Sequence, residues 1–235
     1  MAEKSGYAVI KFVSNNGQCK KGSDYIEGQL LVEYLRGKVE ISKEQLFEWL
    51  KQMSKLIEQY HQCGSNYFYR YVTPYMFLVT TDEQIVLLDQ RDRSNQKIVQ
   101  QMQKEIIRTK FLPPEEPYFK RGSAELDIYG MGRMIQYMLA QIIPEPGLSK
   151  LEIVRFQMII RKCLKYNSEK QYSDVSRILR SYPTLRERKK VIGNQTPTLR
   201  IALALVAVLM GIFIMFSDST KASAEEVNVE EVREL

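Results

Sequence analysis

The sequence predicts an α+β protein that is mainly helical and that carries one membrane-spanning helix near its C-terminus. Three observations support this prediction. Short apolar runs flank turn residues in two places, apolar residues recur at helical spacing in several longer segments, and residues 201–216 contain no charged side chain. Of the 235 residues, 44% are hydrophobic, which is enough for one compact core ahead of the apolar segment.

Two β-hairpins are expected. The first joins residues 7–13 to residues 19–26 through the turn signal Asn15-Asn16-Gly17. The second places a turn at residues 81–83 between two short apolar runs, and a proline-containing loop precedes it.

Helices are expected over most of the remaining chain. Ser42 with Gln45, and Ser149 with Glu152, have the spacing of capping boxes and therefore mark two helix starts. The expected helices cover residues 29–36, 42–60, 96–108, 127–143, 149–164 and 173–182. Three prolines exclude regular structure from residues 112–117.

The apolar segment near the C-terminus is predicted to cross a lipid bilayer. It extends from Leu199 to Ser217 if Arg200 reaches the lipid headgroups. A helix of roughly 16 to 19 residues is about 24 to 28 Å long, the short end of what a hydrocarbon core requires. A buried helix of a soluble protein is the alternative, but such a helix normally carries a polar stripe.

The charges on either side predict the orientation of this span. Basic residues dominate positions 180–200, whereas the tail at 218–235 carries a net charge of −4. Because basic flanks stay in the cytoplasm, we expect a cytoplasmic N-terminus and an extracytoplasmic tail at the cell membrane. The whole chain carries +6 and the span none, so the part before the span carries +10 and can rest against anionic lipid. No basic stretch alternates with aromatic residues, so nucleic acid is not an expected partner.

Cys19, Cys63 and Cys163 are few and far apart in the sequence. Their spacing matches neither a zinc site nor a disulfide framework. We therefore expect three reduced thiols.

From about Tyr25 to Tyr182, the order of these segments resembles the C-terminal lobe of a eukaryotic-like protein kinase. The most specific match is residues 127–132 (DIYGMG), which are similar to the start of the central helix of that lobe. Residues 25–31 resemble the hinge, and residues 56–64 resemble the end of the helix before the catalytic loop. The resemblance implies a kinase-like C-lobe with a remnant N-lobe hairpin.

Residues Tyr69–Leu78 (YRYVTPYMFL) lie where kinases carry the catalytic loop. Arg70, the proline and the apolar end match the family. Tyr71 replaces the aspartate that accepts the substrate proton, Thr73 the neighbouring lysine, and Met76 the asparagine that holds a metal ion. A phenol with a pKa of about 10 is not a base at pH 7. A thioether is a poor ligand for magnesium.

Asp89-Gln90-Arg91 falls at the Asp-Phe-Gly position of the resemblance. The metal-binding aspartate is formally present, but the phenylalanine and glycine are not. We expect Asp89 to be a solvated or ion-paired loop acid, with Arg91 or Arg93 as its partner, in preference to a metal ligand.

The resemblance also implies structural residues. Pro114 and Glu115 are similar to the end of the activation segment, and Gln171 replaces the arginine that usually pairs with that glutamate. Asp127 matches an aspartate that accepts hydrogen bonds from the catalytic-loop backbone, so it is expected to be buried and satisfied. His61 is expected to have a structural role and not a catalytic one.

Aromatic residues surround the former catalytic loop. They are Tyr67, Phe68, Tyr69, Tyr71, Tyr75 and Phe77. We expect them to fill the space that a nucleotide and an N-lobe would occupy; a protein-binding patch is the alternative.

Several parts of an active kinase have no counterpart in the sequence. No Gly-x-Gly-x-x-Gly and no Val-Ala-Ile-Lys occurs, and only about 25 residues precede the hinge-like segment. We therefore expect a catalytically inactive, membrane-anchored scaffold or regulatory module that binds protein partners at the cytoplasmic face and uses no cofactor or metal. The alternatives are an active atypical serine/threonine kinase or other nucleotide-dependent transferase that uses Asp89, and an unrelated globular domain on a tail anchor.

The expected organisation has five parts. They are a remnant N-lobe hairpin and hinge at 1–28, a C-lobe-like domain at 29–182, a basic juxtamembrane linker at 183–198, the span at 199–217 and the acidic tail at 218–235. This layout is also similar to that of the membrane-anchored pseudokinase subunit of bacterial type VII secretion systems, which has a larger external domain.

Overall fold

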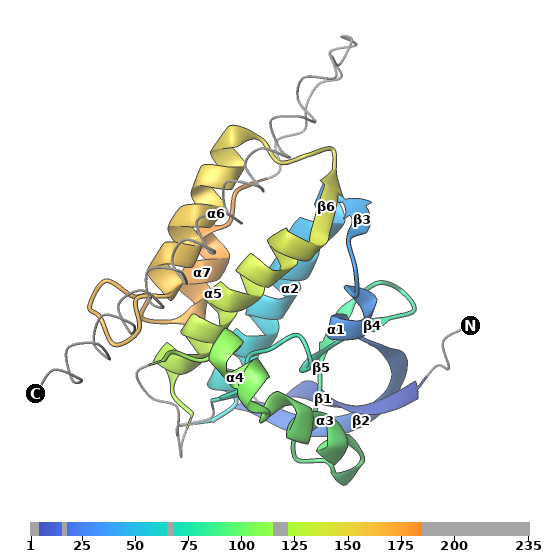
Figure 1. Ribbon diagram of the computed structural model, residues 1–235. Coiled ribbons are helices and arrows are strands. Elements are labelled where there is room, and N and C mark those ends of the chain that lie inside the picture. The colour runs from blue at the N-terminus through green and yellow to red at the C-terminus, as the bar shows by residue number, and fades with distance from the viewer. Residues whose placement is uncertain (1–4, 16–17, 65–67, 115–121, 185–235) are drawn as a thin grey trace, which may run out of the picture. The chain divides into compact units, whose positions relative to one another are not determined.

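A computed structural model of the chain describes residues 5–15, 18–64, 68–114 and 122–184 (Figure 1). The strands are β1 (Ser5–Asn15), β2 (Gln18–Leu30), β3 (Val39–Ser42), β4 (Phe77–Thr80), β5 (Ile85–Leu87) and β6 (Ile142–Glu145). The helices are α1 (Leu31–Tyr34), α2 (Lys43–Gln62), α3 (Gln96–Met102), α4 (Glu105–Phe111), α5 (Ala124–Gln141), α6 (Lys150–Cys163) and α7 (Val175–Ser181), with a 3₁₀ turn at Arg93–Asn95 before α3. More residues lie in helices than in strands, which confirms the predicted α+β class with a helical majority.

The first predicted hairpin is longer than expected and joins a larger sheet. β1 pairs with β2 from Ser5↔Gly28 to Asn15↔Gln18. β2 then continues past residue 28 and pairs with β4, as in Leu30↔Leu78. The result is one antiparallel sheet in the order β1-β2-β4-β5, so the second predicted hairpin, β4 with β5, belongs to the same sheet.

A parallel pair of short strands, β3 with β6, was not predicted. Residues 142–143 were expected to end a helix that began at 127, but α5 begins at Ala124 and ends at Gln141. Pro144 explains this end, because proline cannot continue a helix and it restricts the residue before it to extended conformations. The four residues from Ile142 therefore pair with β3 instead.

Helix α2 begins at its predicted cap and is fixed against the second hairpin. The Ser42 hydroxyl accepts a hydrogen bond from the Gln45 N–H at 3.0 Å. The Gln45 side chain does not complete the capping box; its amide donates to the Glu83 carbonyl at 3.1 Å. The Trp49 indole donates to the same carbonyl at 2.6 Å. The turn at residues 81–83 is thereby tied to α2.

Aromatic packing joins α2, α6 and the residue that follows α7. Phe156 of α6 meets Phe47 of α2 edge-on, with ring centroids 5.4 Å apart, and Tyr182 after α7 at 6.2 Å. The Tyr182 hydroxyl also forms a 2.9 Å hydrogen bond with Ser54 of α2. Complete burial raises the pKa of Tyr182 far above its ordinary value, so this phenol stays neutral.

Gly130 gives a test of the contact between α5 and the loop before β4. A Cβ at this position would lie 2.7 Å from the Val72 Cβ and 3.1 Å from the Val72 carbonyl oxygen. Alanine in a helix gains about 1 kcal/mol over glycine, but overpacking costs about 1–3 kcal/mol. We expect Gly130→Ala to lower the free energy of unfolding, measured by urea denaturation. Gly22→Ala is the control, because its Cβ would meet only a carbonyl at 3.9 Å; equal stability of the two variants would contradict the expected clash.

Within the four described ranges, no helix combines the length and apolar character needed to cross a bilayer. The predicted span at 199–217 and the acidic tail lie outside the described residues, as does the juxtamembrane linker from residue 185 onward. Glu115 and Tyr67 also lie outside them.

Candidate functional site

A buried carboxylate organises the loop that precedes β4. Asp127 lies in the first turn of α5 and has no exposed surface. Its two oxygens accept hydrogen bonds from the backbone N–H groups of Tyr69 at 2.6 Å and Arg70 at 2.7 Å. The backbone contacts expected of Asp127 are therefore present. His61 Nε2 lies 2.8 Å from Asp127 Oδ2, so the single histidine also contacts this carboxylate.

Arg70 has an unusual backbone conformation in this loop. Its φ of 77° lies in the left-handed region, which a residue with a side chain adopts at a cost. The hydrogen bond from its N–H to Asp127 supports that conformation. The guanidinium carbon lies 4.9 Å from the centroid of the Tyr71 ring. The path of the loop is thus set by α5.

The three chemically altered positions of the loop are enclosed in protein. Tyr71 is 8% exposed, Thr73 1% and Met76 0%. Met76 belongs to the hydrophobic core, and its backbone N–H donates to the Thr73 carbonyl at 3.1 Å. All three side chains are buried, and none of them presents a proton acceptor or a hard metal ligand to solvent.

Tyr69 connects the loop to the segment that carries Asp89. Its hydroxyl donates to the Leu88 carbonyl at 2.8 Å, and its own carbonyl accepts from the Gln90 side-chain amide at 3.0 Å. Its ring packs edge-on against Tyr60, with centroids 5.4 Å apart. Burial raises the pKa of Tyr69 well above its ordinary value. Of the aromatic residues around the loop, Tyr69, Tyr71 and Phe77 are buried, as expected for residues that fill space, whereas Phe68 and Tyr75 are partly exposed.

Asp89 lies in a turn after β5 that is fastened to β1. Its carboxylate accepts a hydrogen bond from the Arg91 N–H at 3.0 Å. Its own N–H donates to the Ala8 carbonyl at 2.9 Å. The buried Asn95 amide donates both to Ala8 O at 2.7 Å and to Asp89 O at 2.9 Å. Asp89 therefore caps a local turn.

A cavity of about 130 Å³ borders Asp89. Its other lining residues come from the first hairpin, α2 and the Asp89 turn: Ile10, Lys21, Gly22, Ser23, Tyr60 and Arg91. Burial is the main cause that lowers the pKa of Lys21, followed by Arg91, while Asp89 acts in the opposite direction. Small-molecule sites usually have volumes of about 300–1,000 Å³, so this cavity is small for a nucleotide. Across the described residues, no three His, Cys, Asp or Glu side chains are grouped to hold a metal ion.

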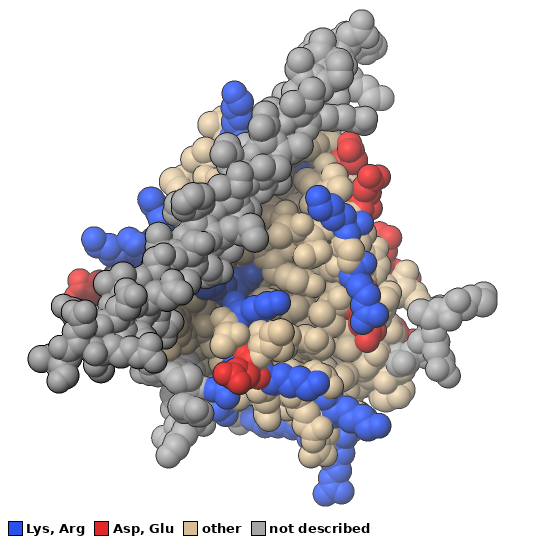
Figure 2. Space-filling view, viewed as in Figure 1, with Lys and Arg blue, Asp and Glu red and all other residues tan. Residues whose placement is uncertain are grey.

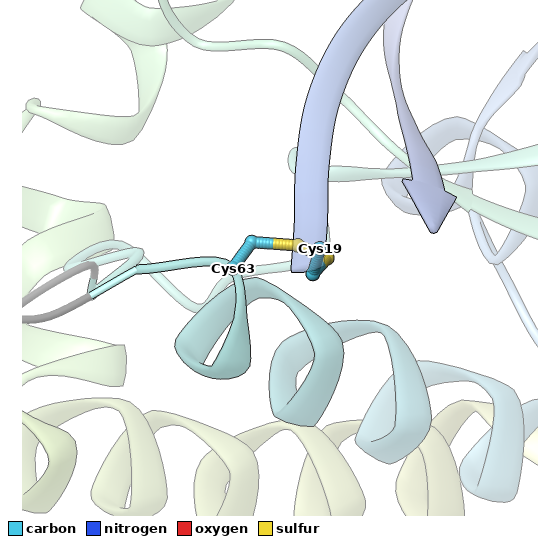
Figure 3. Close-up of a disulfide and its surroundings, with 2 residues drawn as sticks. All are labelled: Cys19 and Cys63. Atoms are coloured by element: carbon cyan, nitrogen blue, oxygen red, sulfur yellow. A yellow bond between two sulfur atoms is a disulfide. The ribbon is translucent and has the colours of Figure 1, made fainter. Parts of the chain in front are cut away.

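Cys19 of β2 and Cys63 at the end of α2 form a disulfide (Figure 3). Their Cα atoms lie 4.6 Å apart, within the usual range for such a bond. The expectation of three reduced thiols was therefore wrong for this pair, because a separation of 44 residues gives no local sign of contact. Cys163 is free and buried, and burial raises the pKa of its thiol.

No protein-family model matches the chain, and no curated protein matches it. A solved structure titled "PpkA-294 apo form" is similar to it at 19% sequence identity. The match covers 77% of this chain and 69% of that chain, with a TM-score of 0.47. This likeness is weak and carries no conclusion about activity.

Proposed function

We propose that this protein is a catalytically inactive, kinase-like module that is anchored in the membrane by residues 199–217 and binds protein partners at the cytoplasmic face. The observation that carries the proposal is the burial of Tyr71 and Met76. In the kinase resemblance, these positions belong to the proton acceptor and to a metal-holding residue. Phosphoryl transfer depends on positioning and on metal-assisted charge stabilisation, and these two side chains supply neither.

The hydrogen bonds that hold the loop in place also support a binding role. Asp127 still binds the backbone of Tyr69 and Arg70, while Asp89 uses its carboxylate in a local turn. A fold that keeps its internal hydrogen bonds and has lost the chemical groups of its loop is suited to binding. The membrane anchor would hold the module next to the bilayer, where protein partners at the cytoplasmic face would bind it.

Nucleotide binding distinguishes this proposal from the active-enzyme alternative. We expect millimolar ATP with magnesium to leave the melting temperature of the detergent-solubilised full chain unchanged, because the cavity beside Asp89 is small. A magnesium-dependent rise that Asp89→Ala abolishes would favour the enzyme. Asp92→Ala is the matched control, since this neighbouring acid caps the 3₁₀ turn through the Ser94 N–H at 2.9 Å. Transfer of labelled γ-phosphate to any acceptor, lost in Asp89→Ala but not in Asp92→Ala, would overturn the proposal.

The scaffold role is tested by copurification. The tagged full chain, extracted from its native membranes in mild detergent, should retain one or more partner proteins in stoichiometric amounts. Recovery of the chain alone, in detergents that preserve its folded domain, would argue against a scaffold and favour a globular domain of unrelated function on a tail anchor.

A further inference from the structure

Helix α6 has an exposed apolar stripe. Leu151, Val154 and Met158 are 80%, 50% and 53% exposed. Their spacing of three and four residues places them on one face of the helix. The opposite face is buried through Phe156, Ile159 and Cys163. The stripe is therefore a continuous surface feature that the described core leaves uncovered.

Basic side chains border this stripe. Lys150, Arg155, Arg161 and Lys162 are exposed. Figure 2 shows Lys and Arg side chains that project from the edge of the molecule where α6 lies in Figure 1. The one acid of the helix, Glu152, turns away from the stripe.

Glu152 is occupied in two contacts at the start of α6. It accepts a hydrogen bond from the Ser149 N–H at 2.6 Å and forms a 3.4 Å ion pair with Lys43 of α2. The two side chains of that ion pair are only 15% and 12% exposed. The outer face of α6 is thus both apolar and basic, and it presents no carboxylate of its own.

This arrangement differs from the other exposed apolar residues of the described chain. The other exposed large apolar side chains, Val13, Tyr25, Ile106 and Ile143, belong to four different elements. Single exposed apolar side chains are common and need no explanation. A row of them on one helix, flanked by lysine and arginine, is the pattern of a helix that lies in the plane of a membrane interface.

We propose that this face of α6 docks on the surface of an anionic lipid bilayer. Leu151, Val154 and Met158 would enter the headgroup region, and Arg155 and Arg161 would contact lipid phosphates. The exposed charged side chains of α6 beside the stripe, Lys150, Arg155, Arg161 and Lys162, are all basic, which is the reason to choose an anionic lipid surface as the occupant.

The inference rests on the proposed membrane anchor, which supplies proximity. The described domain ends at residue 184, and the proposed span begins at Leu199. A chain of this length reaches at most about 55 Å when fully extended. The linker therefore keeps the end of the described domain within about 55 Å of a bilayer that holds the span, and such tethering makes weak surface contacts effective.

Site-specific fluorescence tests the docking. The full chain would be reconstituted in nanodiscs of phosphatidylcholine, with or without phosphatidylglycerol, and labelled at Met158→Cys with an environment-sensitive dye. Ile106→Cys, an exposed apolar position on α4, is the matched control. We expect the label at 158 to shift its emission to the blue and to become several-fold less accessible to an aqueous quencher in anionic discs alone. Equal accessibility at 158 in both kinds of disc, or equal protection at 106, would overturn the proposal.

Charge reversal tests the role of the arginines. Arg155→Glu with Arg161→Glu should abolish the protection at 158, whereas Arg36→Glu with Lys97→Glu, which changes exposed cations elsewhere, should not. Protection that survives the first pair, or that appears only when other membrane proteins are added, contradicts docking on lipid.

A separate experiment, carbonate extraction, tests the proposed membrane anchor. If carbonate extracts the full chain from native membranes, the span is wrong. Flotation with phosphatidylglycerol vesicles then decides the α6 surface alone, since binding that the Arg155 and Arg161 changes remove would support it and absence of binding would refute it.

Discussion

Asp127→Ala is expected to lower the free energy of unfolding by about 3–5 kcal/mol, because each buried donor left without a partner costs about 1–3 kcal/mol. The substitution removes the acceptor for the N–H groups of Tyr69 and Arg70 and the contact with His61. It also removes the support for the left-handed conformation of Arg70. Urea unfolding followed by the fluorescence of Trp49, the single and fully buried tryptophan, measures the loss.

Two further variants separate this effect from a general effect of lost charge. Asp127→Asn keeps one carbonyl oxygen as an acceptor, but its side-chain NH₂ group would face the second backbone N–H. We therefore expect the free energy of unfolding to fall by an intermediate amount. Asp82→Ala changes an exposed acid in the β4–β5 turn and should stay within about 0.5 kcal/mol of the native protein. A similar loss in Asp82→Ala and Asp127→Ala would show that the buried hydrogen bonds are not the cause.

Reduction of the bond between Cys19 and Cys63 is expected to lower the free energy of unfolding by about 4 kcal/mol. The bond closes a loop between residues 44 positions apart, and the loss of chain entropy in the unfolded state scales with the logarithm of that length. The measurement is urea unfolding with and without reductant. In Cys19→Ser, reductant should have no effect, because Cys163 has no cysteine partner in the described chain.

The same cysteine pair also tests the proposed location. A reducing cytoplasm keeps such thiols open. The proposed cytoplasmic location therefore requires that this bond form only on oxidation: rapid alkylation of intact cells, followed by peptide mapping, should find Cys19 and Cys63 alkylated, and the linked peptide should appear in purified protein exposed to air. A linked peptide in freshly alkylated cells would contradict a cytoplasmic domain. Absence of the link even in oxidised, purified protein would contradict the pairing itself.

Elements with local signals could be predicted from the sequence. Ser149 and Glu152 form a complete capping box, with the Glu152 N–H donating to the Ser149 hydroxyl at 3.3 Å. The hairpin expected between residues 7–13 and 19–26 is present as the antiparallel pair β1 and β2. In each of these cases, residues close together in the chain determine the conformation, so a short stretch of sequence contains the information.

Elements that depend on distant partners were missed. The extension of β2 to Leu30 requires β4 as a neighbour, and β6 requires β3, which lies about a hundred positions earlier in the chain. The single helix expected at 96–108 is instead α3 and α4, which are separated at residues 103–104. The last helix is capped by Asp174, whose carboxylate accepts from the Arg177 N–H at 3.1 Å, and not by Ser173. Propensity alone does not distinguish such neighbouring choices.

Some contacts of the candidate site could likewise be predicted from the sequence, and others could not. The resemblance pointed to the backbone contacts of Asp127, since they belong to a recognisable motif. The approach of Lys21 to Asp89 and the double bridge from Asn95 had no signal in the sequence, because both depend on how the first hairpin packs against the loops. A polar residue such as Asn95 reveals its role only when its burial is known.

Because both hairpins belong to one sheet, the first hairpin cannot move freely as a separate body. β2 pairs with β1 along its length and with β4 at its end, and β1 is fastened again to the Asp89 turn through Ala8. Rotation of the hairpin as a separate body would break these ladders together. We therefore expect the domain to offer a partner a single preformed shape, so that recognition requires little reorganisation of its backbone and loses little affinity to it.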